Sequence, residues 1–339
     1  MKILITGGAG FIGMHLADYF LSKRKHVTIL DNFSRKGVTY NAAYLSKKYP
    51  RITIVKTDVR DFATVKRKVK KHDVVIHLAG QVAVTTSIAN PRADFENNVI
   101  GTFNILEAAR LAGHKPAVLY ASTNKVYGKL RGKIVKKGKR YSNLAFPNGV
   151  SETEPLDFYS PYGCSKGAAD QYMHDYARIY GIPTVVLRQS CIYGTRQLGV
   201  EDQGWLAHFL IQSMFEKLLT IYGTGYQVRD VLYIDDLVFL YDKVLQNIYR
   251  VGGEVFNVGG GNARSLSLLE LIVLLEKMMK KKINISFAPK RPGDQDVYVS
   301  DTSKAKKILN WKPLTPCKTG ILMMYEWAKA NKDLLLEFT

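Results

Sequence analysis

The chain is 339 residues long, with 46% hydrophobic and 23% charged residues, the balance of a soluble globular protein. This composition excludes a disordered chain, a collagen and a coiled coil, and the absence of an apolar run of 18 residues predicts no membrane span. The 49 basic residues exceed the 29 acidic ones by 20. We attribute most of this excess to a lysine-rich solvated surface, with binding of an anion or of nucleic acid as the alternative.

The cysteines at 164, 191 and 317 show neither a metal-ligand spacing nor a disulfide framework. We therefore expect no metal site and a reducing, cytoplasmic location. The glycine-rich N-terminus MKILITGGAGFIG has no cleavage site of small residues, so we expect no secretory signal.

Short apolar runs rich in Val, Ile and Leu recur along the first half, at 2–6, 27–30, 52–56, 74–78, 117–121 and 184–188. Continuous hydrophobicity over four or five residues is typical of strands that are buried on both faces. Amphipathic helical patterns lie between them, at 13–22, 61–70, 94–111 and 161–180. This alternation predicts an α/β fold with a doubly wound parallel sheet of the Rossmann type.

Beyond about residue 188 the alternation stops and turn residues multiply. Further helices are expected at 205–216, 235–249, 267–280 and 317–331, which indicates a smaller α/β lobe. The runs VLYID and VFNVGG read as strands that return to the first lobe. We therefore expect a dinucleotide-binding domain over 1–187 and 229–260, and a second domain over 188–228 and 261–339.

A glycine-rich turn follows the first predicted strand and opens the first helix. Its sequence GGAGFIG satisfies both GxGxxG and GxxGxxG. Such glycines allow a tight turn and a close approach of a pyrophosphate, which the N–H groups of the helix N-terminus then face. The predicted cofactor-binding residues here are Gly7, Gly8, Gly10, Phe11, Ile12 and Gly13.

Asp31 ends the second strand, 18 residues after Gly13. This is near the spacing expected of a carboxylate that binds the adenosine ribose, and its charge favours NAD over NADP. Arg35 and Lys36 follow closely and keep NADP as the alternative. Asn32 is included in the predicted cofactor site.

Asp58 and Val59 follow the third strand. We expect both in the cofactor site, where the Asp58 carboxylate can accept a hydrogen bond from an adenine amine. The alternative role of Asp58 is to cap the N-terminus of the following helix.

Tyr162 and Lys166 stand four residues apart at the start of a predicted helix, so they share one face. A cation in that position lowers the pKa of the neighbouring phenol and lets it accept a hydroxyl proton. Thr123, at the end of the strand AVLYA, is expected to hydrogen-bond both the tyrosine and a substrate oxygen. We predict Thr123, Tyr162 and Lys166 as the catalytic residues.

These motifs together resemble the extended short-chain dehydrogenase/reductase family, and specifically its nucleotide-sugar epimerases, over essentially the whole chain. The resemblance includes LAG at 78–80, NVIGT at 98–102, 188–196, QVRD at 227–230 and RPGD at 291–294. It implies that Leu78, Ala79, Gly80 and Asn98 also contact the cofactor. It further implies a homodimer or a dimer of dimers, with no nucleic-acid or membrane partner.

A closer resemblance is to the CDP-paratose/CDP-tyvelose 2-epimerase subfamily, on 80–87, 122–128, 160–172 and 202–205. It implies tightly held NAD and inversion of carbon 2 of a CDP-deoxyhexose through a 2-keto sugar that rotates before it is reduced again. The related 4,6-dehydratases carry Asp-Glu directly after the catalytic threonine, whereas this chain carries Asn124 and Lys125. Many 4-epimerases carry Asn at the position of Cys191.

The resemblance also implies guanidinium groups around a substrate diphosphate. The predicted substrate-binding residues are Gln81, Thr85, Thr123, Asn124, Cys191, Tyr222, Gln227, Arg229, Arg291 and Asp294. The alternatives are helix capping for the threonines, an internal ion pair with Asp230 for Arg229, and a surface position for Arg291.

Two other functions stay open at this point. One is a C4 epimerase acting on a UDP- or GDP-hexose. The other is a non-catalytic protein that binds NAD or RNA, suggested by the net charge of +20 and by seven basic residues between positions 129 and 140, in an expected loop. The lysines of that loop either attract an anionic substrate or stay solvated.

Overall fold

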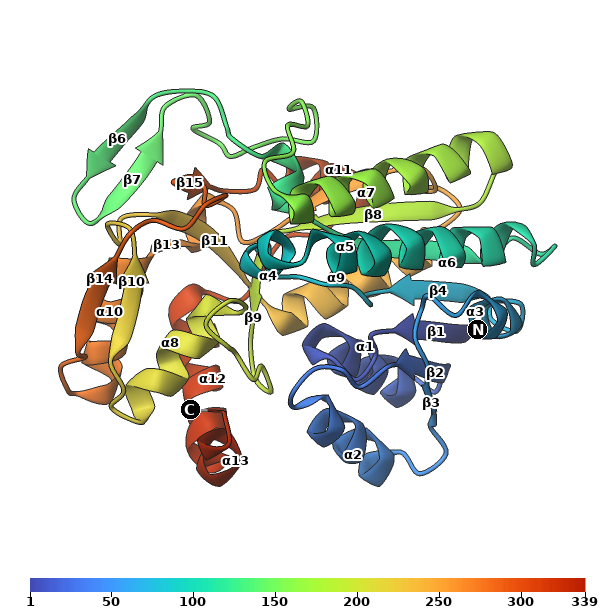
Figure 1. Cartoon of the computed structure of the whole chain (residues 1–339), viewed down its shortest axis with the longest axis horizontal. Helices are drawn as coiled ribbons and strands as arrows, with labels where there is room; N and C mark the ends of the chain where they lie inside the picture. Colours follow the sequence, from blue (N-terminus) through green and yellow to red (C-terminus); the bar gives the residue numbers. More distant parts are fainter. Residues whose placement is uncertain (339) are drawn as a thin grey trace. The chain divides into compact units, whose positions relative to one another are not determined.

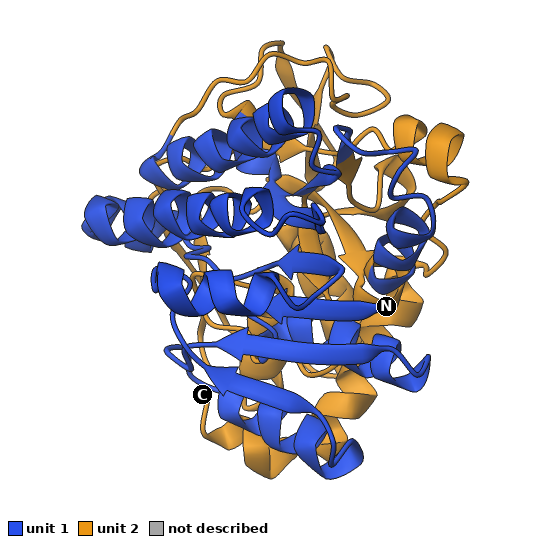
Figure 2. Ribbon diagram, turned by 90° about the vertical axis from the view of Figure 1, so that its right-hand side faces the viewer, with its two compact units in different colours: residues 1–126, 160–188, 238–256 blue, residues 127–159, 189–237, 257–339 orange. Residues whose placement is uncertain are grey.

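The computed structural model describes residues 1–338. The chain forms two compact units, each built from several segments (Figure 2). Unit 1 comprises 1–126, 160–188 and 238–256, and unit 2 comprises 127–159, 189–237 and 257–339.

A seven-stranded sheet is the centre of unit 1 (Figure 1). Its pairings from β3 through β2, β1 and β4 to β5 are all parallel. The predicted doubly wound parallel fold is therefore confirmed. The strand order is β12 (Val255–Val258), β8 (Thr184–Gln189), β5 (Ala117–Thr123), β4 (Val74–His77), β1 (Lys2–Thr6), β2 (His26–Asp31) and β3 (Thr53–Lys56).

Helices connect these strands and cover the sheet, because its inner strands bury both faces and need an apolar cover. Ile3, Leu4 and Ile5 of β1, for example, are all 0% exposed. Helix α6 packs against both α3 and α7. The helices of unit 1 are α1 (Phe11–Ser22), α2 (Val38–Lys48), α3 (Phe62–Val69), α4 (Val84–Ala89), α5 (Pro91–Phe95), α6 (Gly101–Arg110) and α7 (Pro161–Tyr180).

Unit 2 contains three smaller sheets. Strand β11 (Val228–Tyr233) pairs with β9 (Cys191–Tyr193), β13 (Ser265–Ser267) and β15 (Val297–Tyr298). Strand β10 (Leu219–Tyr222) pairs with β14 (Ile285–Ala288), and β6 (Ile134–Lys137) with β7 (Arg140–Asn143). Its helices are α8 (Trp205–Met214), α10 (Leu268–Met279), α11 (Ser303–Leu309), α12 (Cys317–Ala330) and α13 (Lys332–Leu336).

The units differ from the expected domains in three segments, 127–159, 229–237 and 257–260, which all belong to unit 2. Residues 229–237 belong to unit 2, because β11 pairs only with strands of that unit, and the expected return of VLYID to the first lobe is wrong. The expected return of VFNVGG is correct, since β12 joins the central sheet. Residues 127–159, expected in the first domain, belong to unit 2. Helix α9 (Ile234–Gln246) begins in unit 2 and ends in unit 1.

Among residues 1–338, no helix combines the length and the apolarity needed to cross a membrane. The same residues contain no group of three His, Cys, Asp or Glu side chains that could hold a metal ion. None of the three cysteines forms a disulfide.

Candidate active site

The glycine-rich turn of unit 1 joins β1 to α1 through close backbone contacts. The Gly7 N–H donates to the Leu30 carbonyl at 2.8 Å, and Gly7 has a φ of +65°. A Cβ on Gly13 would lie 2.4 Å from the Gly7 carbonyl oxygen. Helix α1 starts after Gly10 without a side-chain cap, so no side chain covers its first N–H groups. A bare helix N-terminus beside a turn without side chains fits a pyrophosphate.

Asp31 ties this turn to the end of β2. Its carboxylate accepts hydrogen bonds from the Ala9 N–H at 3.0 Å and from the Phe33 N–H at 2.9 Å, and the residue is 8% exposed. Arg35 is one of the two residues on which the NADP alternative rests, and it lies close enough to Asp31 for the carboxylate charge to act on it. Burial lowers the pKa of Arg35 below its usual value, and the charge of the Asp31 carboxylate opposes this shift without cancelling it. The predicted position of Asp31 at the carboxyl edge of the sheet is therefore what the structure shows.

Asp58 is held as an anion by its neighbours. Arg60 binds it through Nε and Nη2, each at 2.9 Å, and the Asn32 amide donates to it at 3.2 Å. These contacts, led by the Arg60 hydrogen bond, lower the pKa of Asp58 to about 2. The capping alternative is wrong, because Asp61 caps α3 by accepting from the Thr64 N–H. The adenine contact of Asp58 stays a prediction, as does that of the adjacent Val59.

The turn after β4 lies against β1. The Leu78 N–H donates to the Thr6 carbonyl at 3.1 Å, and the Ala79 N–H donates to the Thr6 hydroxyl at 3.3 Å. A Cβ on Gly80 would stand 2.5 Å from the Asn98 side-chain oxygen. The backbone of Leu78 and Ala79 thus ties the end of β4 to the end of β1, and Gly80 packs closely against Asn98.

Asn98 lies in a π-helical turn, Glu96–Ile100, inserted between α5 and α6. Its amide nitrogen donates to Asp94 at 3.1 Å and to the Ser165 hydroxyl at 3.0 Å, while its oxygen accepts from the Gln81 N–H at 2.9 Å. Turns of this kind often occur at functional sites. The side chain that was predicted to contact the cofactor therefore cross-links the turn after β4 to the helix that carries Tyr162.

Tyr162 and Thr123 meet as predicted. Tyr162, on the first turn of α7, is 7% exposed and makes a side-chain hydrogen bond with Thr123, at the end of β5 and 6% exposed. Burial raises the pKa of Tyr162 to about 12, although the Thr123 hydrogen bond and the charge of Arg35 both lower it. The phenol is therefore protonated at neutral pH in this arrangement and needs further positive charge to act as a base.

Lys166 lies on the same helix but turns toward β5. Its ammonium donates to the Ala121 carbonyl at 2.5 Å and lies 4.2 Å from the centroid of the Tyr120 ring. Burial lowers its pKa to about 7, against the opposing charges of Asp94 and Asp170. The expectation that Lys166 lowers the pKa of Tyr162 is not met here, because the ammonium is directed to the Ala121 carbonyl.

Asp170, a buried residue that the sequence analysis missed, lies one helical turn after Lys166. Asp170 is 0% exposed and binds Arg188 at 2.9 Å through both carboxylate oxygens, and it also accepts from the Ser122 hydroxyl at 2.8 Å. Asp170 stands four residues after Lys166, so the i, i+4 spacing offered a signal for it. This ion pair joins α7 to β8.

His77 is a second missed residue. It is 0% exposed, its ring nitrogens lie 2.7 and 3.0 Å from the Thr6 and Thr102 hydroxyls, and its ring stacks on Tyr120. Burial lowers its pKa to about 3. A neutral imidazole therefore supports the ring that lies beside Lys166.

Four predicted substrate residues belong to unit 1, and Thr123, already described, is one of them. Gln81 makes two hydrogen bonds to the Ala83 backbone, at 2.6 and 2.7 Å. The Thr85 hydroxyl is buried with no hydrogen-bond partner among the described residues, and α4 has no side-chain cap, so the capping alternative is wrong for Thr85. Asn124 is 7% exposed, and its side-chain oxygen lies 3.5 Å from the Thr123 hydroxyl.

Arg229, in unit 2, is fixed by carbonyl oxygens. It donates to Val228 at 2.8 Å and to Gln295 at 2.6 Å, and Asp294 lies 3.8 Å away. The alternative of an ion pair with Asp230 is wrong. Asp230 is fully buried and accepts hydrogen bonds from Ser190, Gly261 and Ser300.

Arg291 lies over the Tyr222 ring, with its guanidinium carbon 3.6 Å from the ring centroid. Glu201 and Asp202 contact its two terminal nitrogens at 2.6 and 3.1 Å. Its side chain is 21% exposed, so it is not a solvated surface arginine. Gln227 donates to the Tyr222 carbonyl at 2.8 Å, and its side-chain oxygen is buried without a partner among residues 1–338.

Cys191 begins β9, and its sulfur accepts a hydrogen bond from the Trp205 indole at 3.3 Å. The indole belongs to the first residue of α8. Cys191 thus fixes the start of a helix in unit 2, and a direct substrate contact stays a prediction.

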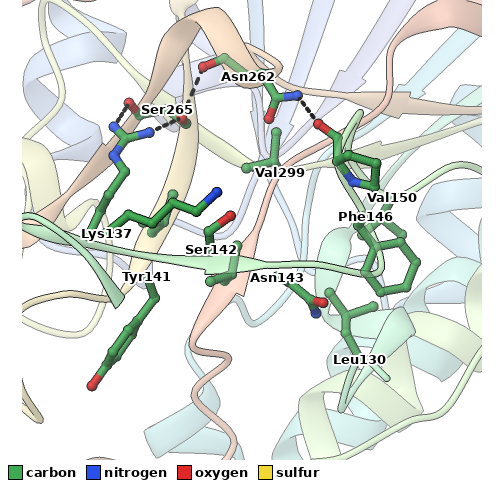
Figure 3. Close-up of a pocket in the computed structure, with 15 residues that line it drawn as sticks. Leu130, Lys137, Tyr141, Ser142, Asn143, Phe146, Val150, Asn262, Ser265 and Val299 are labelled. Atoms are coloured by element: carbon green, nitrogen blue, oxygen red, sulfur yellow. Dashed lines mark hydrogen bonds between the residues drawn. The ribbon is translucent and has the colours of Figure 1, made fainter. Parts of the chain in front are cut away.

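The basic segment 129–140, expected to be a loop, contains one strand of the β6–β7 hairpin. Lys136 donates to the Tyr226 hydroxyl at 2.8 Å, and Arg131 and Arg140 pair with Glu154 and Glu270. The hairpin borders a cavity of about 250 Å³ whose labelled lining includes Lys137, Ser142 and Phe146 (Figure 3). None of the predicted site residues lines this cavity.

Comparison with known proteins decides the family. A family model described as GDP-mannose 4,6 dehydratase matches residues 4–324. The chain belongs to this family of extended short-chain dehydrogenases/reductases. The predicted resemblance is therefore confirmed.

This dehydratase-family chain is 46% identical to the CDP-paratose 2-epimerase of Salmonella typhi over 338 residues, covering 97% of this chain and 100% of the relative. Its fold is similar to UDP-glucuronic acid 4-epimerase from Bacillus cereus in complex with UDP-glucuronic acid and NAD, with a TM-score of 0.85, 32% identity and coverage of 97% and 99%. It is also similar to DesIV, a dTDP-glucose 4,6-dehydratase from Streptomyces venezuelae with NAD and TYD bound, with a TM-score of 0.86, 27% identity and full coverage of both chains.

Proposed function

We propose that this protein is an NAD-dependent epimerase of nucleotide sugars, and that it inverts carbon 2 of a CDP-deoxyhexose of the CDP-paratose type. The observation that carries this proposal is the buried, hydrogen-bonded pair of Tyr162 and Thr123, followed by Asn124 and Lys125. Water elimination needs an acid and a base at those last two positions, and neither residue supplies a carboxyl group. The full-length similarity to a CDP-paratose 2-epimerase supports the choice of carbon 2.

The residues of unit 1 fit NAD. The bare N-terminus of α1 beside Gly7 and Gly13 offers N–H groups to a pyrophosphate, and the Asp31 carboxylate suits ribose hydroxyls and repels a 2′-phosphate. When bound, NAD supplies a hydride acceptor that returns the hydride within the same turnover, so no external reductant is consumed.

The protein's part in the reaction is to move a proton and hold the reacting oxygen. Tyr162, as the phenolate, accepts the proton of the C2 hydroxyl as that carbon is oxidised, and returns it when the 2-keto sugar is reduced on its other face. Thr123 donates a hydrogen bond that orients the oxygen. With NAD bound, we expect Lys166 to leave the Ala121 carbonyl, to hold the cofactor ribose and to bring its charge close enough to Tyr162 to lower the cost of forming the phenolate.

The residues of unit 2 would anchor the substrate while its sugar turns. Arg229 and Arg291 offer guanidinium groups to a diphosphate, and the unpartnered oxygen of Gln227 offers an acceptor to a hydroxyl or an amine. Tyr222 orients Arg291 through its ring, and Asp294 lies beside Arg229.

We also propose that the protein is a cytoplasmic homodimer paired through α6 and α7. Phe103 and Tyr172, from these two helices, are 38% and 43% exposed and their rings are in edge contact. Ile100 and Ile179 add exposed apolar surface to the same helical layer.

The test is a proton NMR spectrum of CDP-paratose incubated with purified protein and no added cofactor. We expect signals of the C2-inverted sugar to appear, because the enzyme carries its own NAD. Inversion of a UDP- or GDP-hexose at carbon 4 instead would assign the other epimerase activity. If bound NAD is present and no sugar nucleotide changes, the epimerase proposal is wrong.

A Gly13→Ala substitution is expected to reduce bound NAD at least about tenfold, because the new Cβ would lie 2.4 Å from the Gly7 carbonyl and open the turn. The measurement is the absorbance of nicotinamide released from denatured protein. Gly138→Ala in the β6–β7 hairpin of unit 2 is the control. Nothing lies within 4 Å of the added Cβ, and because the φ of +59° strains the hairpin alone, this variant should keep its NAD. Normal NAD content in Gly13→Ala would contradict the assigned site.

A further inference from the structure

A short turn in unit 2 carries two carboxylates at its tip. The Val200 N–H donates to the Gln203 carbonyl at 3.0 Å, and the Gln203 N–H donates back to the Val200 carbonyl at 2.9 Å. Glu201 and Asp202 are the two residues between these hydrogen bonds. The turn leads directly into α8, whose first residue, Trp205, is fixed by the bond from its indole to a cysteine sulfur.

Both carboxylates are aimed at one guanidinium. Glu201 contacts Nη2 of Arg291 at 2.6 Å, and Asp202 contacts Nη1 at 3.1 Å. Tyr222 covers one face of the guanidinium plane at 3.6 Å. The terminal nitrogens that an arginine offers to a phosphate are therefore already engaged by carboxylates.

We infer that Glu201 and Asp202 are built-in competitors of the substrate's diphosphate for Arg291. This inference rests on the proposed function, which assigns Arg291 to the diphosphate. The carboxylate side chains are 50% and 42% exposed, so water can solvate them once they are displaced, and the exchange costs little. A diphosphate brings more charge and more oxygens than either carboxylate and can take over both nitrogens.

The consequence is a site that binds its ligand more weakly than its arginines alone would allow. An epimerase must hold the nucleotide while the sugar turns and then release it. Carboxylates that return to Arg291 as the diphosphate leaves favour that release. The turn 200–203 therefore limits affinity, and does so without touching the reacting sugar.

The test compares the wild-type holoenzyme with the double variant Glu201→Gln/Asp202→Asn. We expect CDP to bind about tenfold more tightly to the variant by isothermal titration calorimetry, because two exposed ion pairs no longer oppose it. Inorganic pyrophosphate, a probe without a nucleobase, should also bind more tightly to the double variant. Glu216→Gln, which removes a comparable exposed pair with Lys281 elsewhere in unit 2, is the control and should leave both affinities unchanged.

A further pair of variants assigns the effect to the arginine. In an Arg291→Gln background, the double substitution should change CDP affinity by less than about twofold. Unchanged or weaker CDP binding in the double variant overturns the inference, since weaker binding means that the carboxylates position Arg291 for the ligand. If neither the wild type nor the variant binds any nucleoside diphosphate, the proposed function is wrong as well. This outcome differs from the failure of the inference alone, in which the wild type still binds CDP.

Discussion

Tyr162→Phe is expected to lower kcat by at least about a thousandfold, because in the proposed reaction the phenol oxygen takes and returns the substrate proton. The side chain is buried and hydrogen-bonded to Thr123, so the substitution removes one oxygen and leaves the packing intact. Turnover is measured by proton NMR with CDP-paratose, and bound NAD is measured in the same sample.

Tyr172→Phe is the matched control for this prediction. Tyr172 lies on the same helix but is 43% exposed, and its loss of a hydroxyl should leave kcat unchanged. The Tyr162 variant should keep its NAD and its thermal transition. A Tyr162→Phe enzyme with more than about a tenth of wild-type kcat would assign the proton transfer to another group.

Arg188→Met is expected to lower the free energy of unfolding by about 3–5 kcal/mol. The substitution leaves the Asp170 carboxylate, which is 0% exposed, without the two 2.9 Å bonds that balance its charge. Urea denaturation followed by circular dichroism measures the change. The double variant Asp170→Leu/Arg188→Met should recover most of the loss, because it removes both buried charges together.

The control for this pair is Asp175→Asn on the same helix. It breaks the exposed ion pair with Arg178, and we expect a change of less than about 1 kcal/mol. If Arg188→Met unfolds at the urea concentration of the wild type, or the double variant is no more stable than the single one, the assigned role of the buried pair is wrong.

The strands of unit 1 could be predicted because each one is a compact apolar run bounded by turns. Predicted strand 184–188, for example, corresponds to β8 (Thr184–Gln189). VLYID shows the limit of this reasoning. An apolar run indicates a buried strand but does not show which strands it pairs with. Strand β11 pairs with strands from three distant parts of the chain.

The candidate site also has features that local sequence patterns predicted and features that they did not. The spacing from Gly7 to Gly13, Asp31 at the end of β2, and the helical pair Tyr162 and Lys166 were all visible as local patterns. The direction of the Lys166 ammonium was not visible. The direction of a long side chain depends on which hydrogen-bond acceptor lies near it in the fold. For Lys166 this acceptor is the carbonyl of Ala121, 45 positions away in the sequence.

The sequence by itself therefore determined the fold class and the family, and it predicted the reacting groups, because strand burial, glycine turns and helical spacing are local properties of the chain. Only the tertiary structure decided which charges balance one another. The pairs Asp170–Arg188 and Asp202–Arg291 join residues 18 and 89 positions apart, and their partners are set by packing rather than by spacing. Burial then decided the pKa values of Tyr162 and Lys166, since desolvation depends on everything that surrounds a side chain.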